Sequence, residues 1–424
     1  MKIAIVGAGA TGLVSAKYSL QYGYECDVFE QTGSLGGTWV YNDSTTIDED
    51  GIEVQSTIYK DLIINAPKEL MEYSDFAYPT DIQESYIGHN LVLAYLRAYS
   101  EHFHVEKHIQ YFTRVKRITP VDGGKWDVVV QHLKAQTEKS MLYDAVFVCN
   151  GRFKSPFIPK IMGQDVFRGT QLHSRSFRVP EPYEGQNVVL VGGHRSGIEI
   201  STRIAKFAKH VFLSCRNFPN MVKPPNLLLK PEISELGKTQ VTFSDGTVEE
   251  CDTIVYCTGY LYTCDFLSNK CGLKVENNGV APLYKQIINI EHPTMFFIGL
   301  PYLGSSNAVF DLQVRFAMAA LRKTFILPSK KTMLKEWDIF LATTEEENRS
   351  KKHVHRLCTP QKSEKYSTDI AATSNITPII PAYFKMYARV IECNRAHYLY
   401  KFIDDETFVE IIPNLIDDSY DICV

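Results

Sequence analysis

Two glycine-rich turns, each placed directly after a short apolar run, constrain this chain more than any other feature. The first turn occupies residues 7–12 and follows the apolar run 2–6, and the second occupies residues 192–197 and follows the run 187–191. Such a turn between a strand and a helix lets the backbone approach a pyrophosphate at the helix N-terminus. The chain is therefore predicted to hold two dinucleotides at once and to pass electrons between them.

The first turn has the residues that a dinucleotide site needs. Gly7 allows the sharp bend, Gly9 lets the backbone approach a pyrophosphate, and Gly12 permits close packing of helix against strand. The next expected strand, residues 25–30, ends at Glu30, whose carboxylate can bind ribose hydroxyls. A turn of this kind can also be purely structural, but its place between a strand and a helix favours a ligand.

The loop after Glu30 is expected to continue the same site. Small residues, including Gly37 and Thr38, would let the backbone wrap the ribose and pyrophosphate, and Trp39 would cover the far side. Trp39 could equally be a core residue. The loop contains no pair of cysteines, which argues against a disulfide reductase.

The second turn departs from the usual pattern, because His194 replaces the middle glycine. A side chain there would crowd a pyrophosphate unless the backbone tilts away, although His194 and Arg195 could also make charge-assisted contacts to phosphate. The next expected strand, residues 210–214, is followed by Arg216, which suits the 2′-phosphate of NADP unless it is a solvated surface residue. The cofactor contacts expected of the turn itself come from Gly192, His194, Ser196 and Gly197.

Composition limits the remaining possibilities. With 424 residues the chain should form two or three domains, and its net charge of −4 gives no general attraction to nucleic acid. The ten cysteines show no C-x-x-C spacing and are expected to be buried free thiols, and no metal site is predicted. No apolar run reaches the roughly 18 residues of a membrane span. We expect a soluble, cytoplasmic protein, with secretion not excluded and a homo-oligomer possible.

Outside the turns, alternating segments are the main structural signal. Residues 109–115, 125–131 and 144–149 suggest an antiparallel insert that returns to a parallel sheet. Residues 295–299 are expected to rejoin the first sheet as a strand, and a helix should follow over about 308–323. The remainder of the chain carries no chemical signal.

Four residues between the two turns carry a specific resemblance. Phe167, Gly169, His173 and Phe177 match the string F-x-G-x-x-x-H-x-x-x-aromatic, which identifies the flavin-containing monooxygenases. The chain resembles that family over residues 1 to about 335. Further segments similar to family motifs are 36–39, 59–71, 149–159, 257–260 and 327–329.

The resemblance implies an α/β fold with two Rossmann-like dinucleotide-binding domains. The smaller NADP-binding domain, 159–280, would be inserted in the larger FAD-binding domain, which would comprise 1–158 and part of 281–424. FAD would occupy the first site and NADPH the second.

The resemblance also implies the reaction. NADPH would reduce the flavin, which would combine with molecular oxygen to give a flavin hydroperoxide that oxygenates a soft nucleophile. The Baeyer–Villiger relatives carry Trp where Phe177 stands, so N- or S-oxygenation is favoured. The chain looks like a soluble, insect-type member, a branch that includes alkaloid N-oxygenases. A tertiary amine is the first substrate expected, and an organic sulfide the second.

Several residue roles follow from the resemblance. Asn65 is the candidate catalytic group beside the reactive flavin edge, although it could instead cap the turn before Pro67. His173 and Ser174 are expected to fix the domain linker and the nicotinamide end, and Gln313 is a further expected cofactor contact. The substrate pocket would be lined from segments such as 73–78 and 302–310.

Two other functions remain open at this point. An oxidase would reduce oxygen to hydrogen peroxide without a bound acceptor. A redox sensor would only hold dinucleotides, and His194 favours that possibility because it could weaken NADPH binding.

Overall fold

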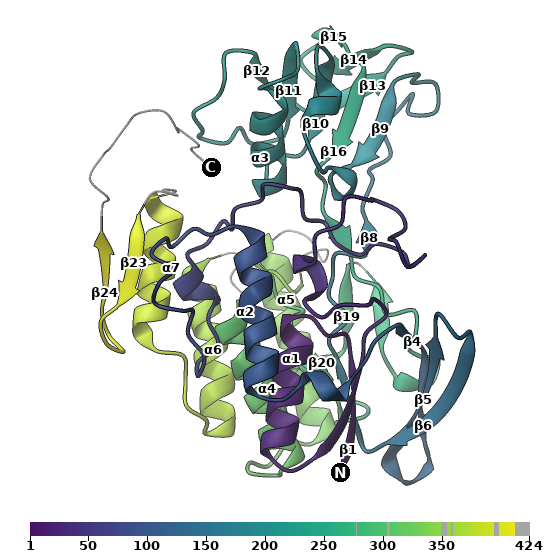
Figure 1. The fold of residues 1–424 in the computed structure, drawn as a ribbon, viewed down its shortest axis with the longest axis vertical. Coiled ribbons are helices and arrows are strands. Elements are labelled where there is room, and N and C mark those ends of the chain that lie inside the picture. Colours follow the sequence, from purple (N-terminus) through teal and green to yellow (C-terminus); the bar gives the residue numbers. More distant parts are fainter. Residues whose placement is uncertain (277, 303–305, 349–353, 358, 394–397, 412–424) are drawn as a thin grey trace.

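Two α/β units, one built on a mainly parallel sheet with an antiparallel edge and the other on a fully parallel sheet, make up most of the computed structural model (Figure 1). It describes residues 1–276, 278–302, 306–348, 354–357, 359–393 and 398–411. The seven strands of the first sheet are, from edge to edge, β20 (Leu283–Tyr284), β21 (Ile288–Asn289), β22 (Met295–Phe297), β7 (Ala145–Val148), β1 (Lys2–Val6), β2 (Glu25–Phe29) and β3 (Ile109–Gln110). The five strands of the second are β12 (Leu227–Lys230), β11 (His210–Ser214), β10 (Asn187–Val191), β16 (Thr253–Tyr256) and β9 (Thr170–His173).

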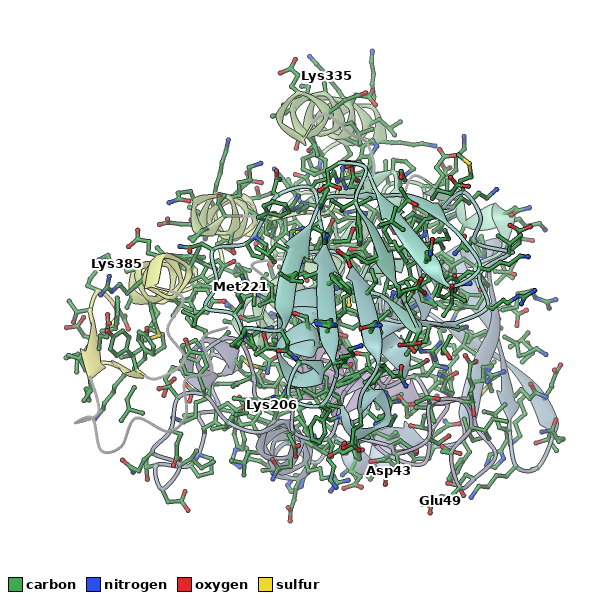
Figure 2. All side chains as sticks on the ribbon, turned by 90° about the horizontal axis from the view of Figure 1, so that it is seen from above. Asp43, Glu49, Lys206, Met221, Lys335 and Lys385 are labelled. Carbon is green, nitrogen blue, oxygen red and sulfur yellow. The ribbon has the colours of Figure 1, made fainter. Side chains whose placement is uncertain are left out.

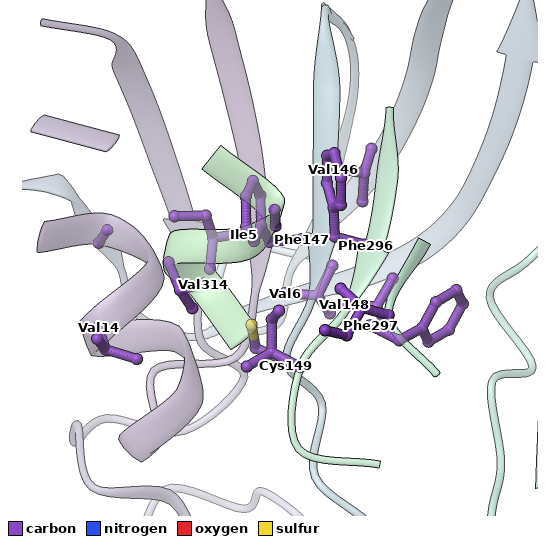
Figure 3. Close-up of a cluster of buried hydrophobic side chains, with 14 of the residues drawn as sticks. Ile5, Val6, Val14, Val146, Phe147, Val148, Cys149, Phe296, Phe297 and Val314 are labelled. Carbon is purple, nitrogen blue, oxygen red and sulfur yellow. The ribbon is translucent and has the colours of Figure 1, made fainter. Parts of the chain in front are cut away.

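The centre of the first sheet is buried, with four of the five residues of β1 and all four of β7 shielded from solvent. Its helices α1 (Ala10–Gln21) and α4 (Asn307–Leu321) pack against each other and against the sheet. Figure 3 shows Val14 of α1 and Val314 of α4 beside Ile5, Phe147 and Phe296 of the central strands. This packing fixes the carboxyl end of β1, where the first glycine turn begins.

The second unit repeats this arrangement on a smaller scale. All neighbouring strands of its five-stranded sheet are parallel, and helix α3 (Arg195–Ile204) follows β10 directly. A three-stranded antiparallel sheet accompanies it, formed by β13 (Ile233–Leu236), β14 (Gln240–Phe243) and β15 (Val248–Glu250). In Figure 1 this unit lies above the first one.

The two connections between the units pair with each other. The chain leaves the first sheet after β7 and passes through β8 (Ser155–Pro156), and it returns after β16 through β17 (Tyr260–Leu261). β8 and β17 form an antiparallel pair, with Tyr260 opposite Pro156. The predicted α/β class with two Rossmann-like units, the smaller inserted in the larger, is confirmed, while the boundaries at 158/159 and 280/281 stay predictions.

The antiparallel insert differs from the expectation in two details. Its strands are β4 (Thr113–Val121), β5 (Lys125–His132) and β6 (Thr137–Tyr143), so residues 109–110 belong to the parallel sheet as β3 instead. The sequence pattern missed β6, because most of its side chains are exposed and do not alternate between apolar and polar. Residues 145–148 return to the parallel sheet as expected.

The C-terminal third is more regular than the sequence indicated. It contains α5 (Lys330–Asn348), α6 (Pro360–Ser374), α7 (Pro381–Cys393) and the hairpin β23 (Leu399–Phe402) and β24 (Phe408–Ile411). The remaining small hairpin is β18 (Lys274–Glu276) with β19 (Gly279–Ala281). Seen from above in Figure 2, Lys385 of α7 and Lys335 of α5 lie at the periphery, outside the strands of the second unit.

Candidate cofactor and active site

Both glycine turns open into one cavity of about 1970 Å³, which lies between the two units. Pockets for small ligands usually measure roughly 300–1,000 Å³, so this cavity has room for more than one such molecule. Its walls include the two turns, both connections between the units and part of α7. The structure thus brings together the two predicted nucleotide sites.

The first turn has the geometry of a phosphate cradle. Gly7 has a φ of +100°, and a Cβ on Gly12 would lie 1.9 Å from the carbonyl oxygen of Gly7, so only glycine fits there. Helix α1 begins after Gly9 without a side-chain cap and without an acidic residue in its first turn. Its free N–H groups therefore suit an anion.

Glu30 lies where a ribose is expected. One carboxylate oxygen accepts a hydrogen bond from the Ala8 amide at 3.0 Å, and the other accepts from the Thr32 amide and hydroxyl, each at 2.9 Å. Burial raises the pKa of this carboxyl, and these hydrogen bonds oppose the rise. An ionised carboxylate has about four acceptor sites, so capacity remains for a ribose hydroxyl.

The loop that follows comes close to the first turn. Gly37 has a φ of +57°, and a Cβ there would lie 3.0 Å from the Cα of Gly9. Thr38 and Trp39 both line the cavity, and Trp39 also packs against the first core. Trp39 is therefore both a cavity wall and a core contact, and its contact with a cofactor stays a prediction.

The second turn keeps the path of the first despite His194. Gly192 has a φ of +114°, and a Cβ on Gly197 would lie 1.8 Å from the Gly192 carbonyl oxygen. His194 precedes α3 with φ −89° and ψ −178°, close to the −79° and −174° of Gly9. The backbone does not tilt away, so the imidazole lies among the residues that line the cavity.

The charge around this second turn is positive. Burial lowers the pKa of His194, and the nearby guanidinium groups of Arg356, Arg216 and Arg195 lower it further. These effects favour the neutral imidazole, which can donate a hydrogen bond to a phosphate. Ser196 also lines the cavity, and α3, like α1, starts without a side-chain cap.

Arg216 lies at the rim of the second site. Its side chain is 82% exposed, and its Nε lies 3.4 Å from Oε1 of Glu232, which is 62% exposed. Both residues line the cavity. A guanidinium with this freedom can turn toward a 2′-phosphate.

His173 and Ser174 lie at the end of β9 with different surroundings. His173 Nδ1 accepts a hydrogen bond from the Arg175 amide at 3.1 Å, which leaves Nε2 to donate to the Gly259 carbonyl at 3.0 Å. Burial lowers the pKa of His173 to about 4, so it is a neutral tether for the returning connection. Ser174 lines the cavity, whereas His173 lies behind it.

Arg178 is a structural residue that the sequence analysis missed. Its buried guanidinium ties the matched string to the loop 42–56 of the first unit through backbone carbonyls. The acceptors are the carbonyl oxygens of Asn42 (2.6 Å), Arg175 (2.8 Å), Phe177 (3.0 Å), Ser44 (3.1 Å) and Ser56 (3.3 Å). The sequence feature that could have indicated this role is the position of Arg178 directly after Phe177, the last residue of the matched string.

Asn65 lines the cavity with an exposed side chain. The following short helix η2 (Lys68–Met71) is preceded by Pro67 and has no side-chain cap, so Asn65 does not cap it. Its backbone carbonyl accepts a hydrogen bond from Nη1 of Arg195 at 3.2 Å. The Asn65 amide is thus free to contact a ligand.

Gln313 does not line the cavity. This fully buried side chain accepts from the Gly299 amide at 2.9 Å and donates to the Tyr366 hydroxyl at 2.7 Å. Both ends of its amide are engaged inside the fold, so it supports the cavity-lining Gly299 from behind. A contact between Gln313 and a cofactor stays a prediction.

Of the two segments expected to line the substrate pocket, one lines the cavity. Tyr302, Ser306, Asn307 and Phe310 line the cavity, but residues 73–78 do not. Tyr73 and Tyr78 are buried and stack on Tyr95, with ring centroids 6.0 and 4.0 Å away. Because these two rings stack on Tyr95, the segment lies in the core and not at the cavity.

One face of α7 replaces that segment as a wall of the cavity. Its residues lie at helical spacing and line the cavity together: Tyr383, Tyr387, Val390 and Ile391. α7 packs on η2, which follows Asn65, and the Tyr383 hydroxyl lies 2.6 Å from Oγ of Ser306. An amphipathic helix without a motif gave no sequence signal for this role.

Comparisons with known proteins agree with this geometry. The family model described as flavin-binding monooxygenase-like matches residues 1–223 and 216–390. The flavin-containing monooxygenase FMO GS-OX4 of Arabidopsis thaliana is 36% identical over 84% of this chain and 81% of its own. Senecionine N-oxygenase of Tyria jacobaeae is 33% identical over 79% of this chain and 75% of its own.

A solved structure is similar over nearly the whole fold. S-allyl-L-cysteine S-oxygenase from Allium sativum superposes with a TM-score of 0.86 at 31% identity, covering 92% of each chain. No helix in the described part of the chain is both long and apolar enough to cross a bilayer.

Proposed function

The chain belongs to the flavin-containing monooxygenase family, and we propose that it uses NADPH and O₂ to oxygenate a soft nucleophile. It is an oxidoreductase whose cofactors are FAD and NADPH. The product would be an S-oxide or an N-oxide. The observation that carries the proposal is the opening of two uncapped helix N-termini into one cavity, with Asn65 on its wall.

The two sites suit different cofactors. The first, with Glu30 and the close approach of Gly37 to Gly9, would hold FAD, which supplies the oxygen-transfer chemistry when it is bound and reduced. The second, with Arg216 at its rim, would hold NADPH. Asn65 would orient the reacting groups as a neutral hydrogen-bonding residue that does not deliver a proton.

The wall beside Asn65 favours a neutral substrate. Among the described residues of η2 and α7 that line the cavity, none carries a carboxylate. They are Leu70, Met71, Tyr383, Tyr387, Val390 and Ile391. A sulfide is neutral at every pH, whereas a tertiary amine must first lose its proton. We therefore place an organic sulfide first and a tertiary amine second, reversing the order expected from the sequence. Both kinds of oxygenase are found among the relatives.

The proposal is tested on the purified, FAD-loaded protein. NADPH should bleach the yellow colour, and air should restore it. NADPH oxidation, hydrogen peroxide and oxygenated product are then measured together with a panel of sulfides, tertiary amines and hydroxylamines. Product in proportion to NADPH supports a monooxygenase. Peroxide with every substrate indicates an oxidase, and a protein that NADPH never bleaches is a sensor.

A further inference from the structure

One face of helix α3 holds the segment that leads to Asn65. Arg195, Glu199 and Arg203 are spaced four residues apart, so their side chains lie on the same face of the helix. We call these three residues the α3 row. Each of them contacts the segment 59–65 of the first unit.

Three hydrogen bonds join the α3 row to this segment. Nη1 of Arg195 donates to the Asn65 carbonyl at 3.2 Å. The Tyr59 hydroxyl donates to Oε2 of Glu199 at 2.8 Å. Nη2 of Arg203 donates to the carbonyl of Asp61 at 2.8 Å. The row therefore fixes both ends and the middle of the segment.

Tyr59 anchors the far end of this segment. The Arg203 guanidinium lies over its ring at 4.8 Å, and its ring meets that of Phe177 edge to face at 5.4 Å. Tyr59 itself packs in the core of the second unit, although it belongs to the first. Glu199 lies one helical turn from each arginine, so its carboxylate offsets part of the positive charge of the row.

The other end of the α3 row lies at the second nucleotide turn. Arg195 is the first residue of α3 and directly follows His194. A ligand that binds the N-terminus of α3 must therefore act on the same rigid helix that holds Asn65. A displacement of α3 at the NADPH site would therefore be transmitted directly to Asn65, the candidate catalytic residue.

We propose that Arg195, Glu199 and Arg203 are positioning residues that align Asn65 when NADP(H) occupies the second turn. Oxygen transfer stays coupled to NADPH use only while this alignment holds. The inference rests on the proposed function for its catalytic consequence, but its structural part can be measured separately.

The test uses Arg203→Met in the FAD-loaded full chain. Arg203 does not line the cavity, and methionine keeps an unbranched apolar stem without the donor. Hydrogen–deuterium exchange of peptides covering residues 59–65 is measured with and without NADP⁺. The matched control is Lys206→Gln, which removes an exposed charge just beyond α3; Lys206 is labelled in Figure 2.

In the wild type and in Lys206→Gln, NADP⁺ should slow exchange in this segment. Arg203→Met should lose most of that protection and release about five-fold more peroxide per NADPH, with NADPH affinity within about two-fold of wild type. Tyr59→Phe, which keeps the ring, should act in the same direction. Glu199→Gln should retain coupling because its amide oxygen still accepts from Tyr59, whereas Glu199→Leu should not.

Wild-type protection in both Arg203→Met and Tyr59→Phe would overturn the inference. Bound FAD and unchanged NADPH affinity show that the variants are folded, so a loss of protection cannot be ascribed to misfolding. A wild-type protein that oxygenates no member of the substrate panel would instead refute the proposed function, and the exchange result would still decide the α3 row.

Discussion

Replacement of Arg216 by alanine tests whether the second site reads the 2′-phosphate of NADPH. The Arg216 side chain is 82% exposed, and its Nε lies 3.4 Å from Oε1 of Glu232. Such an exposed ion pair contributes only about 0–1 kcal/mol, so little stability is lost with the side chain. A charge-assisted bond to phosphate contributes roughly 1.5–3 kcal/mol.

The expected effect follows from these two values. A net loss of about 2 kcal/mol corresponds to a roughly 30-fold fall in kcat/KM for NADPH. NADH has no 2′-phosphate, so its kcat/KM should change by less than about two-fold. Neutralising the competing carboxylate with Glu232→Gln should improve NADPH use slightly, because it frees Arg216.

The assay is the ratio of kcat/KM for NADPH to that for NADH at two salt concentrations. The preference for NADPH in the wild type should weaken as salt increases, because an exposed charge is screened. Lys206→Gln is again the control, since it removes a positive charge from the same unit. An unchanged ratio in Arg216→Ala would refute the assignment of Arg216 as the phosphate-binding residue.

Three further predictions concern the site and its support. Asn65→Ala should keep FAD bound and reducible but lose about 100-fold in product formation while releasing peroxide; tightly coupled turnover would contradict its assigned role. Ile391 is 45% exposed and lines the cavity, so we expect it to limit substrate size. In a series of sulfides of increasing size, Ile391→Trp should lower kcat/KM about ten-fold for the bulky members and little for the small ones. Burial raises the pKa of the Glu72 carboxyl from 4.5 to about 7. The contribution of this group to the free energy of unfolding is therefore largest below pH 4.5, where the carboxyl is neutral, and falls as the pH rises through 7 and the buried carboxyl ionises. Glu72→Gln, which keeps an acceptor for the Tyr78 amide, should therefore raise the free energy of unfolding by ~1–2 kcal/mol near pH 8 but not near pH 4, as denaturant titrations would reveal.

The nucleotide turns were predictable because their requirements are local. A strand, a glycine with positive φ and a glycine without room for a Cβ are fixed by a few consecutive residues, as at Gly7 and Gly12. The same rule identified Gly192 and Gly197 and showed that His194 was unusual. The sequence could not decide whether the backbone would tilt at His194, because that depends on its surroundings.

The rest of the site depends on contacts between distant segments. Ile391 lies more than 300 residues from Asn65, and the helix that carries it has only an ordinary amphipathic pattern. The segment 73–78 was expected to line the substrate pocket, and the family resemblance made Gln313 an expected cofactor contact. In the fold, Tyr73 stacks on Tyr95, and Gln313 accepts a hydrogen bond from the Gly299 amide.

The pairing of β8 with β17 has a consequence for how the molecule is divided. Because Pro156 and Tyr260 lie opposite each other in an antiparallel pair, their Cα atoms are only about 5 Å apart. A short turn could join Pro156 to Tyr260, and the residues between them, 157–259, would then be removed as a single piece. The larger remnant would keep its own apolar core, whereas the excised piece would lose Tyr59, a residue of the first unit that packs in the core of the second. Independent folding is therefore expected of the remnant, whereas the excised piece should be less stable than it is in the whole chain.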